Sequence, residues 1–383
     1  MRNIRKFVSP EIVFGDGALN LLGRYAANFG ANRVFLVTDQ GVVNVGLVDK
    51  AVRMLRAAGV EAIVYDHVSP NPRDYEVMEG AVAYHRTACD VIVALGGGSP
   101  MDCAKGISVV SVNGGNILDL EGVDKVGAPG PPLICIPTTA GSSADVSQFA
   151  IITNVHGQVK NAIISKSVVP DVALIDPATT LTMGRYLTLC TGVDALVHAV
   201  ESYVSSASSD LSDLHALEAI RLLHRYLPEV VERLDDLWLR DRMMLASLEA
   251  GLAFSNASLG AVHAMAHSLG GLLDLPHGEC NALLLDHVIA FNYSAAPERF
   301  NRIGEIFGAH LTGLSDQEKR QAVLESIRSF KEQLGLQSGL GKRGVRSEDI
   351  GLLARKAYAD PCMATNPRRP QIADIEAIYQ EAF

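Results

Sequence analysis

The chain has few aromatic residues, only scattered cysteines and no long apolar run. Aromatic residues make up 6% of its 383 residues, and the six cysteines form no CxxC pair. Such cysteines are typical of free thiols in a reducing compartment, not of a disulfide framework. No apolar run approaches the roughly 18 residues of a membrane span. The charged N-terminal stretch, broken by Pro10, does not resemble a signal peptide. We therefore expect a cytoplasmic protein with no membrane partner.

Basic residues are also in the minority. The chain has 33 Lys and Arg against 43 Asp and Glu, a formal net charge of −10, and no charged blocks. Nucleic-acid binding needs clustered basic residues, so we expect no such partner. Apolar residues make up 48% and charged residues 20%, as in an ordinary globular protein. A chain of this length exceeds the usual size of one hydrophobic core, which predicts two domains.

The type of hydrophobic periodicity changes along the chain. Short β-branched runs at 34–39, 62–66, 90–98 and 133–137 alternate with helical spacing over 42–59 and 74–88. This alternation predicts a parallel sheet with helices on both faces, and segments 148–153 and 160–165 suggest a small hairpin at its margin. From Arg185 onward the pattern is helical. We expect it to be interrupted at Pro228, Gly251, Gly260, Gly270 and Pro276.

These patterns predict two domains of different class. Residues 1–180 should form an α/β domain with a Rossmann-like, nucleotide-binding parallel sheet, and residues 181–383 an all-α domain. A ligand would be expected in the cleft between them.

A glycine turn follows one predicted strand, in the segment DVIVALGGGSPMDCAKG. Gly96, Gly97 and Gly98 lead into a helix for which Ser99 suits the N-cap and Pro100 the first position. Free backbone N–H groups at a helix start favour a phosphate, although a tight turn into a capped helix explains the segment equally well. The usual GxGxxG fingerprint is absent.

Two other predicted strands also end in polar residues. Asp39 could accept hydrogen bonds from a ribose diol and repel a 2′-phosphate, or it could simply cap the next helix. The segment PTTAGSSADVSQFA (137–150) supplies hydroxyls that could donate to phosphate or carboxamide oxygens. All three features lie at strand carboxyl ends, where open α/β sheets bind ligands.

The predicted helical domain contains carboxylate and imidazole groups in apolar surroundings. In TGVDALVHAV, Asp194 and His198 lie four residues apart on one helix face, with Glu201 on the same side. The segment 261–279 adds His263 and His267, one turn apart, and then His277. The Asp194/His198 pair alone fits a hydrogen bond as well as a metal site. The two clusters together predict a divalent cation, with mixed ligands that suit Fe(II), Zn, Mn or Ni.

The motifs resemble those of the iron-containing (group III) alcohol dehydrogenases, which share a dehydroquinate synthase-like fold. The resemblance runs over essentially the whole length, through GGGSPMDCAK, PTTAGSS, TGVDALVHAVESYVS, VHAMAHSLGG, LPHGECNA and DPCMATNPR. It implies an NAD-dependent oxidoreductase that carries Fe(II), or alternatively Zn, and acts on small primary alcohols or aldehydes. It also implies a homodimer or larger homo-oligomer.

The resemblance also assigns residues. It implies that Asp194, His198, His263 and His277 hold the metal and that His267 is a catalytic proton relay. It implies a substrate pocket lined by Phe149, Phe254 and Cys362. It implies nucleotide contacts at Asp39, Asn71, Gly97, Gly98, Ser99, Thr138, Thr139, Ser142 and Lys160.

The sequence departs from the family pattern at a few positions. Ser142 and Asp145 stand where most relatives have Thr and Glu, and Ser268 where relatives often have Pro. The SSADVSQF variant resembles a subgroup of alcohol dehydrogenase-like proteins assigned to regulation of alcohol oxidation. A regulatory or sensory protein with weak turnover, or a glycerol dehydrogenase-like zinc enzyme, is therefore the alternative.

Overall fold

A parallel β-sheet organises the N-terminal half of the chain. The computed structural model describes residues 4–157, 159–273, 275–336 and 339–383, and within these ranges six strands form one sheet. Their order is β1 (Glu11–Phe14), β9 (Val172–Ile175), β6 (Leu133–Pro137), β4 (Val91–Gly96), β2 (Arg33–Val37) and β3 (Glu61–Tyr65). All neighbours in the sheet pair in parallel.

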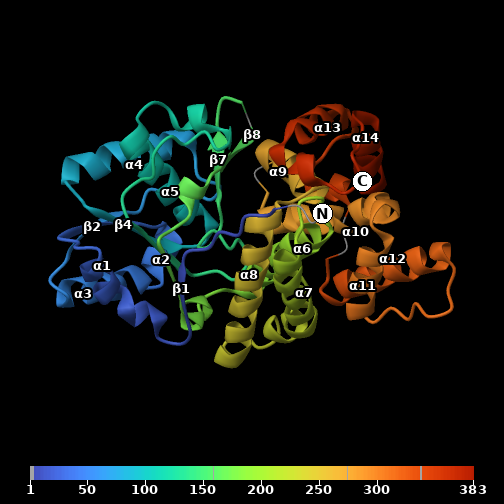
Figure 1. Ribbon diagram of the computed structural model, residues 1–383, viewed down its shortest axis with the longest axis horizontal. Helices are drawn as coiled ribbons and strands as arrows, with labels where there is room; N and C mark the ends of the chain where they lie inside the picture. The colour runs from blue at the N-terminus through green and yellow to red at the C-terminus, as the bar shows by residue number, and fades with distance from the viewer. Residues whose placement is uncertain (1–3, 158, 274, 337–338) are drawn as a thin grey trace. The chain divides into compact units, whose positions relative to one another are not determined.

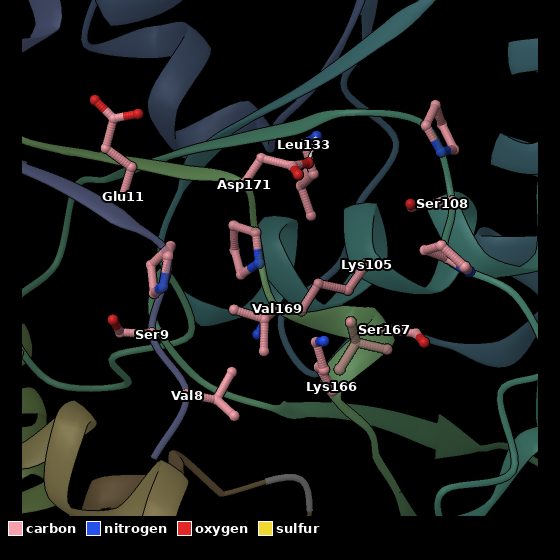
Figure 2. A pocket seen from close by; sticks show the side chains of 16 residues that line it. Val8, Ser9, Glu11, Lys105, Ser108, Leu133, Lys166, Ser167, Val169 and Asp171 are labelled. Carbon is pink, nitrogen blue, oxygen red and sulfur yellow. Dashed lines mark hydrogen bonds between the residues drawn. The ribbon is translucent and has the colours of Figure 1, made fainter. Parts of the chain in front are cut away.

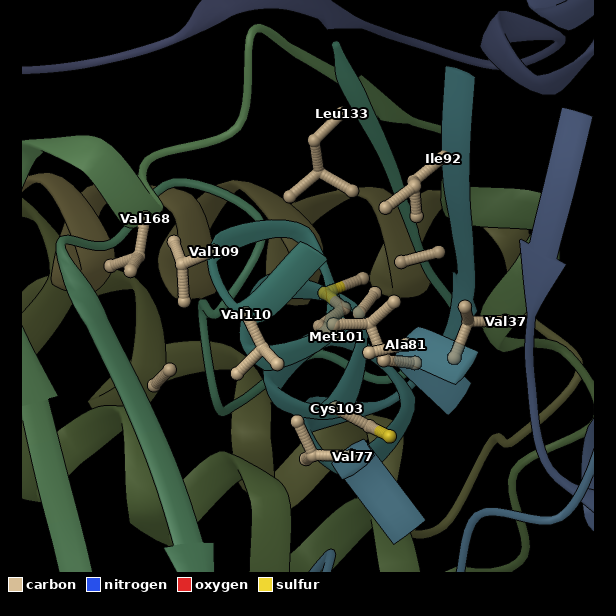
Figure 3. Close-up of a cluster of buried hydrophobic side chains, with 14 of the residues drawn as sticks. Val37, Val77, Ala81, Ile92, Met101, Cys103, Val109, Val110, Leu133 and Val168 are labelled. Carbon is tan, nitrogen blue, oxygen red and sulfur yellow. The ribbon is translucent and has the colours of Figure 1, made fainter. Parts of the chain in front are cut away.

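Each face of the sheet has its own hydrophobic core, because successive strand residues point to opposite sides. Phe35 and Val37 of β2 pack with residues of α4 (Asp74–Thr87) and α5 (Gly98–Asn113). Their neighbours Val34 and Leu36 pack with residues of α1 (Leu22–Asn28) and α3 (Leu47–Ala57). The two helix pairs lie on opposite sides of β2 and β4 (Figure 1), and Figure 3 shows the first cluster around Met101. Burial on both faces explains the continuous apolar runs in these strands.

The remaining strands form a second small sheet in the order β5 (Gly122–Val123), β8 (Val159–Ile164), β7 (Phe149–Asn154). β7 and β8 pair antiparallel, from Phe149 opposite Ile164 to Asn154 opposite Val159. The expected hairpin is therefore present.

After residue 184 the described chain contains helices. They are α6 (Arg185–Val204), α7 (Asp210–Val230), α8 (Leu237–Ala257), α9 (Ala261–Leu273), α10 (His277–Asn292), α11 (Pro297–Ile306), α12 (Asp316–Gln333), α13 (Ile350–Ala359) and α14 (Ile372–Glu381), with short 3-10 turns between some of them. The predicted fold class, an α/β region followed by a helical region, is confirmed. None of the described helices is long and apolar enough to cross a membrane.

The described part of the chain divides into two compact units. The sheet unit comprises residues 8–184 and 234–244, and the helical unit comprises residues 4–7, 185–233 and 245–383. This division falls after Gly184, a few residues beyond the expected boundary at 180/181. It also assigns 234–244, including the start of α8, to the sheet unit.

Several local expectations were wrong. The single helix expected over 42–59 is divided into α2 (Gln40–Asn44) and α3, because Gly46 adopts a left-handed conformation with φ 79°. Strands β1 and β9 were missed, since each has only four residues. Pro228, Gly251 and Gly270 lie inside α7, α8 and α9 and do not end them. Only Gly260 and Pro276, of the expected breaks, lie at helix boundaries.

Candidate metal centre and nucleotide-binding edge

The polar strand ends predicted from the sequence meet at one edge of the sheet. β6, β4 and β2 are neighbours, and because they are parallel their carboxyl ends lie together. The Thr138 N–H donates to the Gly96 carbonyl over 2.8 Å, which joins the end of β6 to that of β4. The Thr38 hydroxyl donates to the Leu95 carbonyl over 2.8 Å, which joins β2 to β4. The structure thus brings Asp39, the glycine turn and the hydroxyl-rich loop together.

The glycine turn approaches the hydroxyl-rich loop closely. A Cβ at Gly97 would lie 3.2 Å from Thr139 side-chain atoms, and one at Gly98 would lie 3.0 Å from the Ser142 Cβ. Side chains at these positions would push the two segments apart. The glycines therefore keep backbone and hydroxyl groups close together, as a phosphate-binding turn requires.

The expected cap of the following helix was wrong. α5 begins at Gly98 with Gly97 as its N-cap, and no side chain caps it. Ser99 is inside the first turn, where its Oγ accepts the Asn71 N–H over 3.1 Å. Asp102, also in α5, accepts the Ile151 N–H over 3.2 Å. The helix therefore starts earlier than expected, at Gly98.

Three further predicted nucleotide residues form one hydrogen-bonded group. Asn71 has a left-handed backbone with φ 57°, its N–H donates to Ser99, and its Oδ1 accepts the Lys160 ammonium over 2.8 Å. A positive φ on a non-glycine residue is uncommon and marks backbone held by its surroundings. The group connects the start of α5 to β8.

Asp39 is half-buried at the start of α2. Its Oδ1 accepts the Val42 N–H over 3.0 Å, so the helix-capping interpretation is correct. A carboxylate has two oxygens, and capping through one of them is compatible with the proposed contact to a ribose.

In the helical unit, the predicted metal residues come from three helices. Asp194 and His198 lie on α6, which is almost wholly buried, His263 lies in the first turn of α9, and His277 is the first residue of α10. Ligand atoms of Asp194, His263 and His277 all lie within 4.8 Å of one another. His198 also belongs to this cluster, because its Nε2 lies near Asp194 Oδ1 and its ring stacks on that of His263, with centroids 4.6 Å apart.

The spacing within this cluster suits a shared cation. The Nε2 atoms of His198, His263 and His277 lie 3.9, 3.8 and 3.7 Å from Asp194 Oδ1. These separations are too long for hydrogen bonds. Ligands about 2.1 Å from one tetrahedral ion lie roughly 3.4 Å apart, which is close to the observed spacing. The donor set of one carboxylate and three imidazoles, gathered around one oxygen, therefore fits a divalent metal ion.

The charges of the cluster also favour a cation. Burial alone would raise the pKa of Asp194, but the imidazoles of His198 and His277 hold that pKa well below its usual range. Burial would lower the pKa of His263, yet the adjacent carboxylates of Asp194 and Glu201 raise it to about 9. The buried carboxylates thus favour positive charge beside them, which the imidazoles carry in the absence of a metal ion.

Glu201 supports the cluster from α6. Its carboxylate accepts the N–H groups of Gly260, over 3.0 Å, and Val262, over 2.6 Å, at the start of α9. It also contacts Nδ1 of His263 at 2.7 Å. A carboxylate at a helix N-terminus is favoured by the helix dipole, and its contact with Nδ1 leaves Nε2 facing Asp194. The sequence placed Glu201 on the right helix face but did not reveal this function.

Asn281 of α10 supports the other side of the cluster and was missed. Its Nδ2 donates to Asp194 Oδ1 over 2.7 Å, and its side chain is fully buried. A polar residue four positions after His277 was the available sequence signal, because both lie on one face of a helix.

His267 lies beside the cluster but has a different partner. Its ring stacks on that of His277, with centroids 5.2 Å apart and an interplanar angle of 15°. Its Nδ1 lies 2.8 Å from Asp360 Oδ2, a buried partner that sequence reasoning missed. Burial alone would raise the pKa of Asp360, but the adjacent His267 lowers it.

The predicted substrate residues fall in different parts of the fold. Phe254 of α8 stacks on His198 with centroids 4.3 Å apart, so the aromatic ring directly covers a predicted metal ligand. Cys362 is fully buried beside Asp360 and His267. Burial and the Asp360 charge raise the pKa of its thiol well above the usual value. Phe149 begins β7 in the sheet unit.

The sheet unit also has a cavity of about 470 Å³ near the starts of β1, β6 and β9 (Figure 2). Lys105 lies beside it, and its ammonium donates to the carbonyls of Ser147 and Phe149 over 3.0 and 2.7 Å. This cavity is at the strand starts, away from the carboxyl-end edge that carries the predicted nucleotide residues.

Comparison with known families accounts for nearly the whole chain. The family model "Iron-containing alcohol dehydrogenase" matches residues 9–177, and "Fe-containing alcohol dehydrogenase family, C-terminal" matches residues 188–383. The chain belongs to the iron-containing alcohol dehydrogenase family. The family predicted from the sequence motifs is therefore confirmed.

Individual members of the iron-containing alcohol dehydrogenase family match this chain end to end. A 1,3-propanediol dehydrogenase of Klebsiella pneumoniae is 40% identical over 98% of both chains. An NAD-dependent methanol dehydrogenase of Bacillus methanolicus is 37% identical over 98% of this chain and 99% of its own. A crystal structure of 1,3-propanediol oxidoreductase matches with a TM-score of 0.96 and 39% identity, covering 100% of each chain.

Proposed function

We propose that this protein is a metal-dependent alcohol dehydrogenase that transfers hydride between NAD(H) and a small primary alcohol or aldehyde, with Fe(II) as its metal. The observation that carries the proposal is the buried cluster in which three imidazole nitrogens surround the Asp194 carboxylate at 3.7–3.9 Å. Family membership and the names of the relatives support this activity.

Asp194, His198, His263 and His277 would hold the metal. When bound, a divalent ion polarises an alcohol oxygen and lowers its pKa, so that hydride transfer becomes possible near neutral pH. Glu201 and Asn281 orient His263 and Asp194, and Phe254 covers His198. His277 is the most accessible of the four, with 25% of its side chain exposed, so substrate would approach from its side.

The carboxyl-end edge of the sheet would hold the dinucleotide. When bound there, the dinucleotide would supply the nicotinamide as hydride acceptor for alcohol oxidation. The uncapped start of α5 and the Thr139 and Ser142 hydroxyls would bind phosphate, and Asp39 would accept hydrogen bonds from the ribose. We accordingly assign nucleotide binding to residues 1–180 and metal binding to residues 181–383.

His267 would move the proton that the alcohol loses. Its Nδ1 is held by Asp360, so Nε2 is the nitrogen that can accept a proton. The resemblance to the family implies that His267 lies near the substrate, and its stacking on His277 supports this interpretation. The resemblance to the family implies that Phe149, Phe254 and Cys362 line the substrate site, and such apolar side chains suit short alcohols.

We further propose that the protein acts in the cytoplasm as a homodimer or larger homo-oligomer. The resemblance to the family supports the assembly. All six cysteines are buried and form no disulfide within the described residues, which supports a reducing compartment.

Anaerobic purification with metal quantification, followed by turnover of short primary alcohols with NAD and NADP, tests the proposal. We expect about one iron per chain and NAD-dependent oxidation. Asp194→Ala and His277→Ala should lose metal and activity, whereas His215→Ala, which removes a histidine paired with Glu249, should keep both. Full metal and activity in either site variant would refute the site. Bound metal without turnover would favour a regulatory protein, and zinc would favour a glycerol dehydrogenase-like enzyme.

A further inference from the structure

We propose that Asp360 is a positioning residue that holds His267 as the tautomer with a proton on Nδ1, so that Nε2 remains the acceptor. The proposal rests on the proposed function, in which His267 relays the proton.

The contact between Asp360 and His267 is short and buried. Oδ2 of Asp360 lies 2.8 Å from Nδ1 of His267, and the two side chains are 7% and 5% exposed. An ionised carboxylate only accepts hydrogen bonds, so Nδ1 must carry the proton. In a neutral ring, Nε2 then has the lone pair. A carboxylate that orients a catalytic imidazole in this way also stabilises the imidazolium that forms during proton transfer.

The 3-10 turn that follows Asp360 does not need the contact with His267, because the other carboxylate oxygen of Asp360 caps the turn. Asp360 precedes Pro361, and its Oδ1 accepts the Cys362 N–H over 2.8 Å at the start of a 3-10 turn. Asp176 precedes Pro177 in the same arrangement, and its Oδ1 accepts the Ala178 N–H over 3.1 Å.

The two turns differ in what the second carboxylate oxygen does. Oδ2 of Asp176 accepts the backbone N–H of Leu19, whereas Oδ2 of Asp360 contacts an imidazole. One oxygen completes the turn in both cases. At residue 360 the other is therefore available for a role at His267.

His267, Asp360 and Cys362 could alternatively bind a metal, since their ligand atoms all lie within 4.8 Å. The 2.8 Å separation of Nδ1 and Oδ2 is that of a hydrogen bond, and the Cys362 thiol is protonated at neutral pH. These features favour the hydrogen-bonded pair.

Asp360→Asn tests the proposal, because its amide keeps an acceptor for the Cys362 N–H but presents N–H to His267. In the metal-free full chain labelled with ¹⁵N-histidine, the His267 nitrogens should change from the Nδ1-protonated to the Nε2-protonated pattern. In the iron-loaded enzyme, kcat should fall by roughly 10²–10⁴-fold, with iron content unchanged and KM altered by less than about threefold. Asp360→Ser, which retains a cap acceptor, should reproduce the kcat loss. The matched control Asp176→Asn should keep kcat within about threefold.

A double-mutant cycle separates Asp360 from His267. If Asp360 acts through the imidazole, Asp360→Asn should add less than about twofold to the loss in His267→Ala. An unchanged tautomer, an undiminished kcat, an additive loss or a loss of iron in Asp360→Asn would overturn the proposal. Full turnover in His267→Ala would instead refute the proton relay of the proposed function, while the ¹⁵N spectra would still decide whether Asp360 sets the tautomer.

Discussion

Replacing Glu201 with Gln should loosen the start of α9 and weaken the metal site together. Oε2 of Glu201 contacts both the Gly260 N–H, at 3.0 Å, and His263 Nδ1, at 2.7 Å. Oε1 accepts the Val262 N–H over 2.6 Å. An amide has only one oxygen, so Glu201→Gln leaves at least one of these donors facing an NH₂ group.

The expected magnitude follows from the bonds that are lost. Hydrogen bonds to a charged group contribute about 1.5–3 kcal/mol each, so the loss of one or two of them gives about 1.5–5 kcal/mol after partial relaxation. Relaxation is restricted because Gly260 packs closely against its neighbours. A Cβ added to Gly260 would lie only 2.9 Å from Glu201 Oε1 and 2.8 Å from Asn366 Oδ1. Loss of a partner that orients a metal ligand typically weakens metal binding by about 10–100-fold.

Hydrogen exchange of peptides covering residues 260–267 measures the local effect, and iron competition with a chelator measures the metal affinity. A loss of 3 kcal/mol corresponds to roughly 150-fold faster exchange through local opening. Glu249→Gln is the matched control, because Glu249 contacts His215 Nδ1 at 2.6 Å, outside the metal cluster. It should leave iron affinity unchanged. Unaltered exchange and iron affinity in Glu201→Gln would refute the supporting role of Glu201.

Two further predictions concern cofactor choice and acid stability. Asp39→Gly should improve NADP use more than it impairs NAD use, because the Asp39 carboxylate would repel a 2′-phosphate. Equal kcat/KM for NAD and NADP in the unmodified enzyme would contradict this role of Asp39. Burial alone would raise the pKa of Asp286, but Lys331 and Arg328 lower it to about 2. Its ionised form therefore stabilises the fold above about pH 4, and this contribution is lost as the pH falls toward 2. Asp286→Asn should lower the unfolding free energy by about 2–3 kcal/mol at pH 6, and denaturant titrations should show this difference shrinking between pH 4 and 2.

The sheet was predictable where its strands are buried on both faces. β2, β4 and β6 are almost continuous apolar runs, and their order along the chain alternates with helices. β1 and β9 were not predicted because a run of four residues shows too little periodicity. The break at Gly46 was not predicted because the apolar spacing continues across it. These errors are local, and they leave the fold class unaffected.

The candidate metal residues were predictable for a different reason. Asp194 and His198 are costly in a buried apolar helix unless they have partners, so their presence indicated a site before any contact was known. Their supporting partners carry no such signal. Glu201 and His263 are 62 residues apart, and His267 and Asp360 are 93 apart, so the contacts exist only after the helices pack.

The two Asp-Pro turns show which contacts local sequence can predict and which depend on tertiary packing. In both, the sequence around Asp176 and Asp360 determines that one carboxylate oxygen caps the N–H two residues later, because proline starts the turn and the neighbouring N–H is near. Nothing local determines the partner of the second oxygen. Packing supplies a backbone N–H to Asp176 and the ring of His267 to Asp360. The same dipeptide is thus structural at residue 176 and, on our proposal, sets a proton's position at residue 360, and only the tertiary contact distinguishes the two.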